Sequence, residues 1–422
     1  MKQFIKGVMI AVYHFLNTIL PKDRHLVVLS SGNGKSMGGN PGAIYEYAVR
    51  NSSGYRFVWF LTKEYLSAHP AEKPRLNGPD GSRTKIVTYH HPMYYFYMSR
   101  AGIWIFDSRQ EPFVVKKRDV VYLQTWHGTP LKKLGLDLED MNMAGEHRDI
   151  QAYAAAVKKE AASWDMLIAQ NPFSHETFKR CFGYEGSILD IGYPRNDMLT
   201  AHAASAEGVG KDGLTDGSAA RKKRTILYAP TWRDDRYMDN GWYEYSSPLD
   251  FEELEKSLGD RFTFIVRPHY LVKMKKGDIP ESVIKSGFVR IASETEDIDH
   301  LYLAADAMIT DYSSTMFDYS LLGRPMIFYV YDLDEYKNRL RGFYFDFENE
   351  APGPLCDTAA EVAQALEKAF DGSADEDVRE RAEAFRRKYN AFDDGNASYR
   401  AWEAVEKKLA GKHLRGINEK NK

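Results

Sequence analysis

Cysteine is nearly absent from this chain of 422 residues, which contains only Cys181 and Cys356. The two cysteines lie far apart and have no ligand-like spacing. This argues against a disulfide framework and against a cysteine metal site, and it is typical of a protein from a reducing compartment.

An excess of charge of one sign is also missing, because the formal net charge is only -3. A basic patch for nucleic acid and an acidic tail are therefore not expected. Long hydrophobic runs are scarce as well. The apolar run at residues 8–20 contains four polar or amphipathic residues and ends at Pro21. It is shorter than the roughly 20 apolar residues that a spanning helix needs, and no small-residue cleavage site follows it.

What the first 21 residues do contain is the pattern of an amphipathic helix. Its apolar stripe consists of Ile5, Val8, Val12, Phe15 and Ile19. A helix of this kind can lie on a membrane surface, and it can equally pack against the body of its own protein. We expect residues 1–21 to associate with a membrane, with packing as the alternative.

Short apolar segments alternate with helical patterns along most of the chain, which predicts parallel sheets covered by helices. Strands are expected at residues 25–30, 56–61, 85–88, 103–107, 120–124, 166–169, 188–191, 225–229, 262–266, 307–309 and 326–331. Helices are expected at residues 42–50, 151–163, 173–182, 317–322, 359–370 and 377–409. The polar tail beyond Gly411 is expected to be loose.

Residues 201–224 are rich in Ala, Gly, Ser and charge and show no period. This composition predicts a linker or a surface insertion. It separates an N-terminal domain at residues 22–200 from a C-terminal domain at residues 225–375. The remaining residues, 376–422, are expected to form C-terminal helices and the tail.

One strand–turn–helix unit places three hydroxyl side chains at the start of a helix: Ser313, Ser314 and Thr315. Free backbone N–H groups and the positive end of the helix dipole make such a position suitable for a phosphate. Asp318 follows Ser314 by four residues, so both are expected on the same side of the helix. A simple helix cap is the alternative interpretation.

A glycine-rich loop, Ser31 to Pro41, follows the first strand and includes Gly34 and Lys35. The P-loop motif needs a glycine five residues before Gly34, where this chain has Leu29, so the motif is rejected. The loop can bring backbone close to a ligand, although a flexible turn is an equally good interpretation.

His127 follows the strand at residues 120–124, and Thr129 can cap a helix whose first residue would be Pro130. The dipole of that helix would favour a neutral imidazole, the form that a general base needs. The sequence therefore indicates a catalytic His127, with a structural histidine as the alternative.

Cationic side chains follow several other predicted strands: Arg195, Arg233, Arg267 and His269. Ligands of open α/β sheets bind outside the carboxyl ends of strands, and arginine recognises phosphate through a fixed fork of donors. The cationic residues of the C-terminal half, Arg233, Arg267 and His269, predict a diphosphate site. Asp332 and Asp334 have the spacing of a metal–nucleotide motif, but a solvated helix start is the better interpretation, and no metal is expected.

Several of these motifs together resemble one family, the CDP-glycerol glycerophosphotransferases. They are QTWHGTPLK at 124–132, YAPTWR at 228–233, RPH at 267–269 and TDYSSTMFDY at 310–319, joined by GYPRND at 192–197 and by 34–41. The resemblance covers residues 25–400 in the same order. It implies a GT-B-type fold with two Rossmann-like domains facing across a cleft, and a peripheral enzyme at the cytoplasmic face of the cell membrane.

The resemblance also implies roles for individual residues. His127 and His269 would be catalytic. The donor CDP-glycerol would be bound by Thr231, Trp232, Arg233, Arg267, Asp311, Ser313, Ser314, Thr315 and Asp318. The acceptor side would include Gly34, Lys35, Asn40, Lys132 and Arg195. No cofactor is implied.

The expected reaction is transfer of glycerol phosphate from CDP-glycerol to a hydroxyl of a lipid-linked glycan or a glycerol phosphate polymer, with release of CMP, in the synthesis of teichoic acid or a related polymer. His127 would act as the base, and the phosphate-binding residues would stabilise charge. The alternatives are a nucleotide-sugar glycosyltransferase, a ribitol phosphate transferase, and a non-enzymatic polymer-binding protein at the membrane surface.

Overall fold

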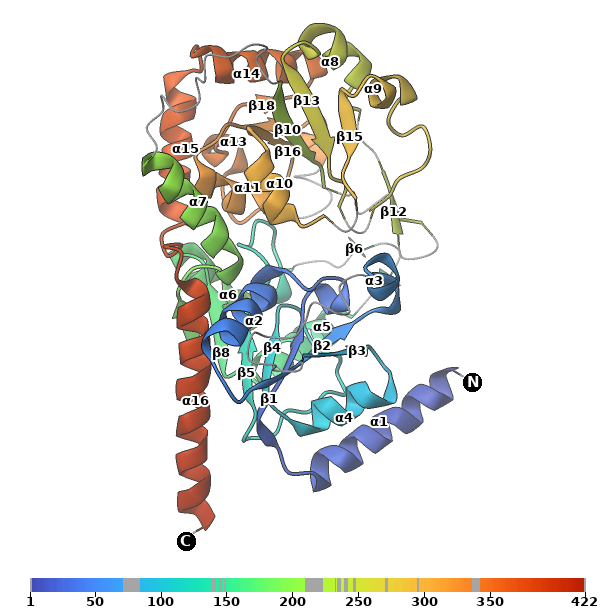
Figure 1. The fold of residues 1–422 in the computed structure, drawn as a ribbon, viewed down its shortest axis with the longest axis vertical. Coiled ribbons are helices and arrows are strands. Elements are labelled where there is room, and N and C mark those ends of the chain that lie inside the picture. Colours follow the sequence, from blue (N-terminus) through green and yellow to red (C-terminus); the bar gives the residue numbers. More distant parts are fainter. Residues whose placement is uncertain are drawn as a thin grey trace. The chain divides into compact units, whose positions relative to one another are not determined.

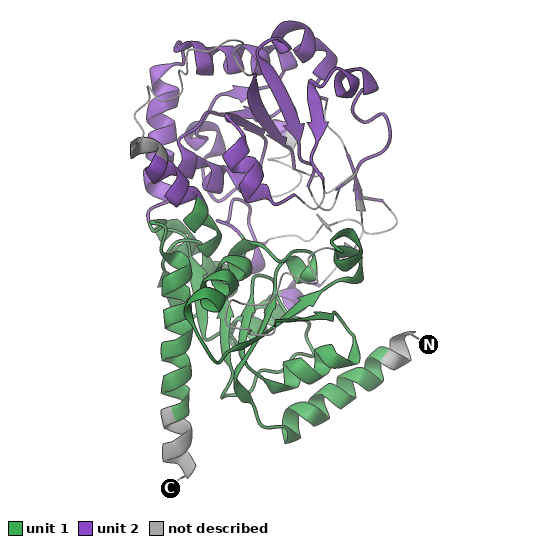
Figure 2. Cartoon of the chain, in the orientation of Figure 1, with its two compact units in different colours: residues 1–127, 154–198, 392–422 green, residues 128–153, 199–391 purple. Residues whose placement is uncertain are grey.

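The computed structural model describes residues 2–70, 84–138, 142–143, 146–147, 149–208, 223–231, 233, 237–238, 242–245, 248–269, 272–293, 296–335 and 342–420. The chain forms two compact units, coloured separately in Figure 2. Unit 1 comprises residues 1–127, 154–198 and 392–422, and unit 2 comprises residues 128–153 and 199–391. Unit 1 is therefore built from three separate segments of the chain.

Unit 1 is organised around a seven-stranded parallel sheet with the strand order β3-β2-β1-β4-β5-β8-β9. Its strands are β1 (Asp23–Ser30), β2 (Arg56–Leu61), β3 (Lys85–Thr88), β4 (Ala101–Phe106), β5 (Val121–Gln124), β8 (Met166–Ala169) and β9 (Ser187–Asp190). This is the Rossmann order with one strand added. The central strands are almost continuously apolar because helices cover both faces of the sheet.

Helices cover the two faces of this sheet (Figure 1). On one face α2 (Gly39–Asn51) and α16 (Ala397–Lys420) share a core with the strands. On the other face α4 (Pro92–Arg100) packs Tyr94 edge-on against Phe60 of β2. The remaining helices that contribute to this unit are α3 (Lys63–Ala68), α5 (Ile150–Ala161) and α6 (Pro172–Phe182).

Helix α1 (Lys2–Ile19) lies along α4 (Figure 1). Its inner face buries Tyr13 and Asn17, and both side chains donate to the backbone carbonyl of Val115, at 3.0 and 3.1 Å. A helix thus spans this segment, and one of its faces packs on unit 1. Of the described helices, none is long and apolar enough to cross a membrane.

Unit 2 repeats the same strand order in a six-stranded parallel sheet, β15-β13-β10-β16-β17-β18. Its strands are β10 (Arg224–Ala229), β13 (Phe262–Val266), β15 (Val289–Ile291), β16 (Ala307–Thr310), β17 (Met326–Tyr329) and β18 (Leu355–Cys356). One face carries α8 (Phe251–Leu258), α9 (Glu281–Lys285) and α14 (Ala359–Asp371). Further helices are α10 (Ile298–Ala304), α11 (Thr315–Tyr319), α12 (Leu333–Glu335), α13 (Phe347–Glu350) and α15 (Glu376–Tyr389).

Two small sheets complete the strands. One is the three-stranded sheet of β11 (Tyr237–Met238), β12 (Trp242–Glu244) and β14 (Val272–Lys273). The other is the hairpin of β6 (Asn142–Met143) and β7 (Glu146–His147).

The structure corrects four expectations about local structure. The stretch predicted as a linker from residue 201 begins inside α7 (Asp197–Gly208), and residues 209–222 lie outside the described part. The helix predicted over 377–409 is two helices, α15 and α16, and α16 continues through the tail predicted to be loose. The helix predicted at 317–322 begins at Thr315 and ends at Tyr319, followed by a 3₁₀ turn. No helix begins at Pro130.

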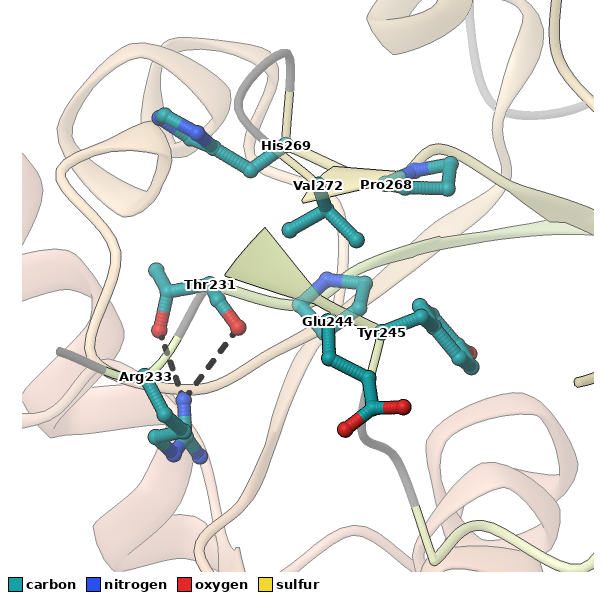
Figure 3. Close-up of a pocket in the computed structure, with 8 residues that line it drawn as sticks. Thr231, Arg233, Glu244, Tyr245, Pro268, His269 and Val272 are labelled. Carbon is teal, nitrogen blue, oxygen red and sulfur yellow. Dashed lines mark hydrogen bonds between the residues drawn. The ribbon is translucent and has the colours of Figure 1, made fainter. Parts of the chain in front are cut away.

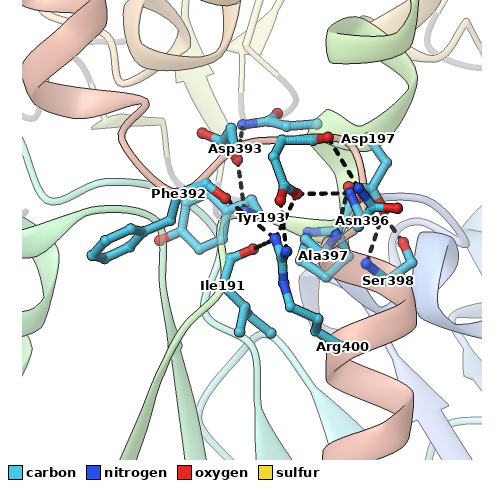
Figure 4. Close-up of polar contacts among 12 residues, drawn as sticks. Ile191, Tyr193, Asp197, Phe392, Asp393, Asn396, Ala397, Ser398 and Arg400 are labelled. Carbon is cyan, nitrogen blue, oxygen red and sulfur yellow. Dashed lines mark hydrogen bonds and ion pairs between the residues drawn. The ribbon is translucent and has the colours of Figure 1, made fainter.

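Helix α16 is joined to unit 1 by a polar cluster at its first turn (Figure 4). The Asp197 carboxylate accepts hydrogen bonds from the backbone N–H groups of Ala397 and Ser398, at 2.9 and 2.8 Å. Asp393 accepts from the backbone N–H of Tyr193 at 2.8 Å. Asp197 thus caps a helix that follows it by 200 residues, and it satisfies two donors that the helix itself leaves unpaired.

Replacing Asp197 by alanine is expected to lower the free energy of unfolding by about 0.5–2 kcal/mol, the usual cost of a lost helix cap. Urea denaturation followed by circular dichroism measures the change. The matched control is Glu403→Ala, an exposed substitution in the middle of the same helix, which should change the stability by less than about 0.5 kcal/mol. Equal stability of both variants would contradict the capping role.

Candidate active site

In each unit, an aspartate lies at the point of the sheet where the strand order reverses. In unit 1, Asp107 follows β4 and accepts hydrogen bonds from Ser31 Oγ (2.6 Å) and from the backbone N–H of Gly32 (2.9 Å), in the loop after β1. In unit 2, Asp311 follows β16 and accepts from the backbone N–H of Thr231 (2.9 Å), in the loop after β10. These are the positions at which open α/β sheets bind ligands.

His127 follows β5 at this edge of unit 1, and its side chain is exposed. Its Nδ1 lies 2.8 Å from the backbone carbonyl oxygen of Asp107. A carbonyl oxygen can only accept, so Nδ1 carries the proton in this contact, and in the neutral imidazole Nε2 then keeps its lone pair. The ring stacks on Trp126 with 4.4 Å between centroids. This arrangement gives the tautomer that a general base requires.

Two side chains hold the backbone around His127. Asn40 Nδ2 donates to the carbonyl oxygens of Thr125 (3.3 Å) and Trp126 (3.1 Å). Arg195 Nη1 donates to the carbonyl oxygen of His127 at 2.9 Å. Trp126 has a φ of 53°, a left-handed conformation that is strained for a bulky residue. The surrounding contacts therefore fix an unfavourable turn that sets the direction of the imidazole.

The helix dipole expected beside His127 is absent, since residues 128–130 do not begin a helix. Instead, this segment is tied to residues more than 200 positions later. Lys133 N donates to the carbonyl oxygen of Gly342 (2.9 Å), and Tyr344 N donates to that of Leu131 (3.0 Å). The contact with the Asp107 carbonyl, and not a dipole, orients the imidazole.

The predicted acceptor-side residues divide between the units. Gly34, Lys35, Asn40 and Arg195 lie in unit 1, and Lys132 lies in unit 2. Gly34 has a φ of 83°, and a Cβ atom there would come within 2.6 Å of the Tyr89 ring, so the position needs glycine. Burial lowers the pKa of the Lys35 ammonium, and Glu64 opposes this effect.

Arg233 is the most tightly held of the predicted donor-side residues. Its Nη1 donates to Asp311 (2.9 Å), and its Nε donates to Asp332 (2.7 Å). The side chain is 4% exposed and lies 5.3 Å from the ring centroids of both Tyr312 and Tyr331. Burial alone would lower the pKa of this guanidinium, but the neighbouring carboxylates outweigh burial and raise it. Arg233 therefore remains charged and is held between two acids.

Around Arg233 lies a small pocket, shown in Figure 3. It is lined by Pro230, Thr231, Arg233, Glu244, Tyr245, Pro268, His269 and Val272. Thr231 and Arg233 follow β10 and lie below His269 in the view, whereas His269 follows β13 (Figure 3). The cavity measures about 10 Å³, which is room for little more than one water molecule. The structure thus brings together Thr231, Arg233 and His269, while Trp232 lies outside the described residues.

The hydroxyl-rich turn follows β16 as predicted. Ser313 Oγ accepts from the backbone N–H of Thr315 (3.3 Å), and the hydroxyl of Ser314 makes no capping hydrogen bond to the helix. Ser313 and Asp318 are both buried. Helix α11 has only five residues, so its dipole is small, and any anion would be bound by hydroxyl and N–H groups of the turn.

Arg267 follows β13, and its Nη1 donates to the carbonyl oxygen of Ser293 at 2.5 Å. Asp332, considered above as part of a carboxylate pair, accepts from Arg233 and from the Tyr312 hydroxyl (3.0 Å). Among the described residues, no group of three or more histidine, cysteine or acidic side chains could hold a metal ion.

Sequence reasoning missed Asp107, Trp126, Glu244 and Asp332 as parts of these sites. Two signals were available. Asp107 ends a buried apolar strand, where an unpaired carboxylate is rare, and Trp126 directly precedes His127 within the motif. Glu244 lies on a three-residue strand that gives no recognisable pattern.

Comparison with known proteins identifies the family. The model of the CDP-glycerol:poly(glycerophosphate) glycerophosphotransferases matches residues 12–407. The chain belongs to this family. The family expected from the motifs is therefore confirmed.

Two curated relatives of this glycerophosphotransferase family illustrate the similarity. The teichoic acid glycerol-phosphate transferase of Staphylococcus aureus (strain NCTC 8325 / PS 47) is 37% identical over 91% of this chain and 93% of its own length. The teichoic acid poly(glycerol phosphate) polymerase of Bacillus subtilis (strain 168) is 40% identical over 83% of this chain. The match covers only 44% of the Bacillus protein, so this chain spans less than half of that relative.

Solved structures confirm the predicted fold class. The wall teichoic acid polymerase TagF superposes with a TM-score of 0.79 at 31% identity, over 96% of this chain and 94% of that one. Another TagF structure, obtained with CDPG, has a TM-score of 0.80. A plant glycosyltransferase, UGT73P12 of Glycyrrhiza uralensis, shares the fold alone, with a TM-score of 0.53 at 11% identity, over 94% of this chain and 97% of that one.

Proposed function

We propose that this protein transfers glycerol phosphate from CDP-glycerol to a hydroxyl group of a glycerol phosphate polymer or a lipid-linked glycan, releasing CMP. The observation that carries the proposal is His127, whose Nδ1 is bound to the Asp107 carbonyl so that Nε2 can accept a proton, in a chain of this transferase family. The names of the relatives support a role in teichoic acid synthesis.

In the proposed mechanism, unit 2 binds the donor and unit 1 presents the acceptor. His127 Nε2 removes the proton from the acceptor hydroxyl, and the resulting oxygen attacks the phosphorus that carries glycerol. A new P–O bond forms, the bond to the CMP oxygen breaks, and CMP leaves with the electron pair. Arg267, His269 and the Ser313–Ser314 turn stabilise charge on the phosphoryl group and on CMP. No covalent enzyme intermediate is required, because such transfers depend mainly on position and electrostatics.

Arg233, Asp311 and Asp318 have a different part in this proposal from that of Arg267. Arg233 is bound to Asp311 and Asp332, so it fixes the loop that carries Thr231 and positions the donor through that loop. Asp318 lies one helical turn after Ser314 and adds a polar group beside the donor.

Release of CMP by purified protein tests the function. CDP-glycerol, CDP-ribitol and UDP-sugars are each supplied with a synthetic lipid-linked glycerol phosphate acceptor. CMP formed from CDP-glycerol, and only when the acceptor is present, is the expected result. CMP from CDP-ribitol alone would indicate a ribitol phosphate transferase, and UDP release alone would indicate a glycosyltransferase. Donor binding without any turnover would support a non-enzymatic polymer-binding protein.

The outer face of α1 supports association with a membrane surface. Val8, Val12, Phe15 and Ile19 remain exposed along this helix, with 63% of Phe15 and 55% of Ile19 accessible. Exposed apolar groups in a stripe of this kind are typical of helices that lie in the membrane interface.

Replacing Phe15 and Ile19 together by glutamate is therefore expected to reduce binding to vesicles by more than about tenfold, since each buried apolar side chain contributes about 1.5–3 kcal/mol. Cosedimentation with vesicles that contain anionic lipid measures the binding. His14→Glu and Thr18→Glu together form the matched control, because these side chains are exposed on the same helix outside the stripe. If both double variants lost vesicle binding equally, the added negative charge alone would explain the loss. That result would contradict a membrane contact through the apolar stripe.

A further inference from the structure

Unit 1 contains a cavity of about 480 Å³ at the carboxyl edge of its sheet. Its walls come from the loops after four neighbouring strands, β1, β2, β3 and β4. The lining residues are Asn33, Thr62, Lys63, Glu64, Thr88, Tyr89, His90, Tyr94, Arg109, Gln110 and Glu111. Its volume lies within the range of small-molecule sites. Of these residues, Asn33 alone belongs to a segment noted in the sequence, the glycine-rich loop after the first strand.

Backbone strain is concentrated at this edge. Within the described part of the chain, the non-glycine residues with positive φ are Asn33 (55°), His90 (59°) and Trp126 (53°). Two of them line the cavity, and the third precedes His127. Each follows a strand of the same sheet. Strained backbone conformations persist where surrounding contacts hold them, and they are typical of ligand sites. The shape of the cavity is therefore fixed by the contacts around these residues.

The cavity is linked to the proposed base through Asp107. The carboxylate of Asp107 binds Ser31 and Gly32, just before Asn33, and its carbonyl oxygen accepts from His127 Nδ1. Arg109, Gln110 and Glu111 follow it in the chain after Ser108. One residue therefore fixes both the proposed base and two walls of the cavity.

Charges in the cavity lining are balanced and largely paired. Arg109 Nε donates to Glu160 at 2.7 Å. Glu111 accepts from Lys6 Nζ (2.8 Å) and from His90 Nε2 (3.0 Å). Lys63 supplies one ammonium group, but Glu64 and Glu111 would repel a phosphate. The guanidinium of Arg109 is already bound to a carboxylate. A phosphate is therefore a poor ligand for this cavity.

Hydroxyl groups fit the lining better. Asn33 and Gln110 carry amides that both donate and accept, Thr88 carries a hydroxyl, and the carboxylates accept. The partly exposed Tyr89 ring supplies an apolar surface for C–H groups. We propose that this cavity binds an uncharged polyhydroxylated unit, a sugar ring, of the acceptor. The acceptor role rests on the function proposed above, whereas binding of the sugar does not.

Saturation-transfer NMR on the full chain without donor tests the ligand class. The neutral probes are methyl glucoside and methyl N-acetylglucosaminide, and the charged probes are glycerol 3-phosphate and inorganic phosphate. We expect signals from a neutral glycoside. Two variants should weaken them about tenfold, as the loss of one or two hydrogen bonds implies. Asn33→Gly removes the amide and retains the positive φ, and Gln110→Ala removes the second amide. The matched control, Gln151→Ala, alters an exposed glutamine outside the cavity and should bind normally.

Activity assays separate this inference from the proposed function. With a glycan-bearing acceptor, both variants should raise the acceptor KM about tenfold and leave the donor KM and kcat nearly unchanged. Binding of only the charged probes, or binding equal in the variants and the wild-type protein, would overturn the inference while CMP release continued. A protein that binds the glycoside but never releases CMP would instead contradict the proposed function and leave the sugar site in place.

Discussion

Replacement of His127 by alanine is expected to lower kcat for CMP release by about 10²–10⁴-fold, the usual contribution of a general base. The melting temperature should stay nearly the same, because the imidazole is exposed and substitutions of exposed side chains change stability little. Steady-state kinetics with saturating donor and acceptor measure the loss, and differential scanning calorimetry measures the stability.

The matched control for His127 is His300→Ala, which removes another exposed histidine. Its rate should equal that of the wild-type protein. The pH profile gives a second criterion, since loss of a general base removes the fall in rate on the acid side. A His127→Ala enzyme with nearly the full rate would show that the base is another group.

Replacement of Arg233 by alanine is expected to lower the free energy of unfolding by about 3–5 kcal/mol. The substitution leaves Asp311, which is 3% exposed, buried without its positive partner. Chemical denaturation followed by fluorescence measures the change. Arg290→Ala is the matched control, because Arg290 pairs with Glu296 at the surface, where such pairs contribute no more than about 1 kcal/mol.

A double variant distinguishes a structural Arg233 from a ligand for the donor. Removing Asp311 together with Arg233, as Arg233→Ala with Asp311→Ala, takes away the more deeply buried of the two unpaired carboxylates and should recover part of the lost stability. If Arg233→Ala instead unfolds like the wild-type protein and only raises the donor KM, the guanidinium binds the substrate directly.

The strands were predictable because parallel strands covered on both faces appear in the sequence as short continuous apolar runs. The predictions for 56–61, 85–88 and 262–266 coincide with β2, β3 and β13. The segment after His127 was not predictable. Thr129-Pro130 is a good local helix start, but pairing with residues 342–344 overrides that preference, and no local pattern reports a contact so distant in the chain.

In the candidate site, too, contacts between residues far apart in the chain were not predictable. Positions of His127, Arg233 and His269 at strand ends followed from the sequence. Their partners did not, because Asp311 and Asp332 follow Arg233 by 78 and 99 residues. The group that sets the tautomer of His127 is a backbone carbonyl, which any residue type could supply. Side-chain identity alone therefore predicted where these residues lie. It did not predict the tautomer of His127 or the ion pairs of Arg233.

Helix α16 affects the order in which the two units can fold during translation. Its residues Ala401, Trp402, Val405 and Leu409 complete the core of unit 1, yet they are translated after the whole of unit 2. Unit 2 needs no later segment, whereas one apolar face of the sheet of unit 1 stays partly uncovered, with α2 as its cover, until α16 has been made. Although domains generally fold in the order of synthesis, here the second unit can finish before the first. Translation that stops before α16 should therefore yield a folded unit 2 joined to an aggregation-prone unit 1.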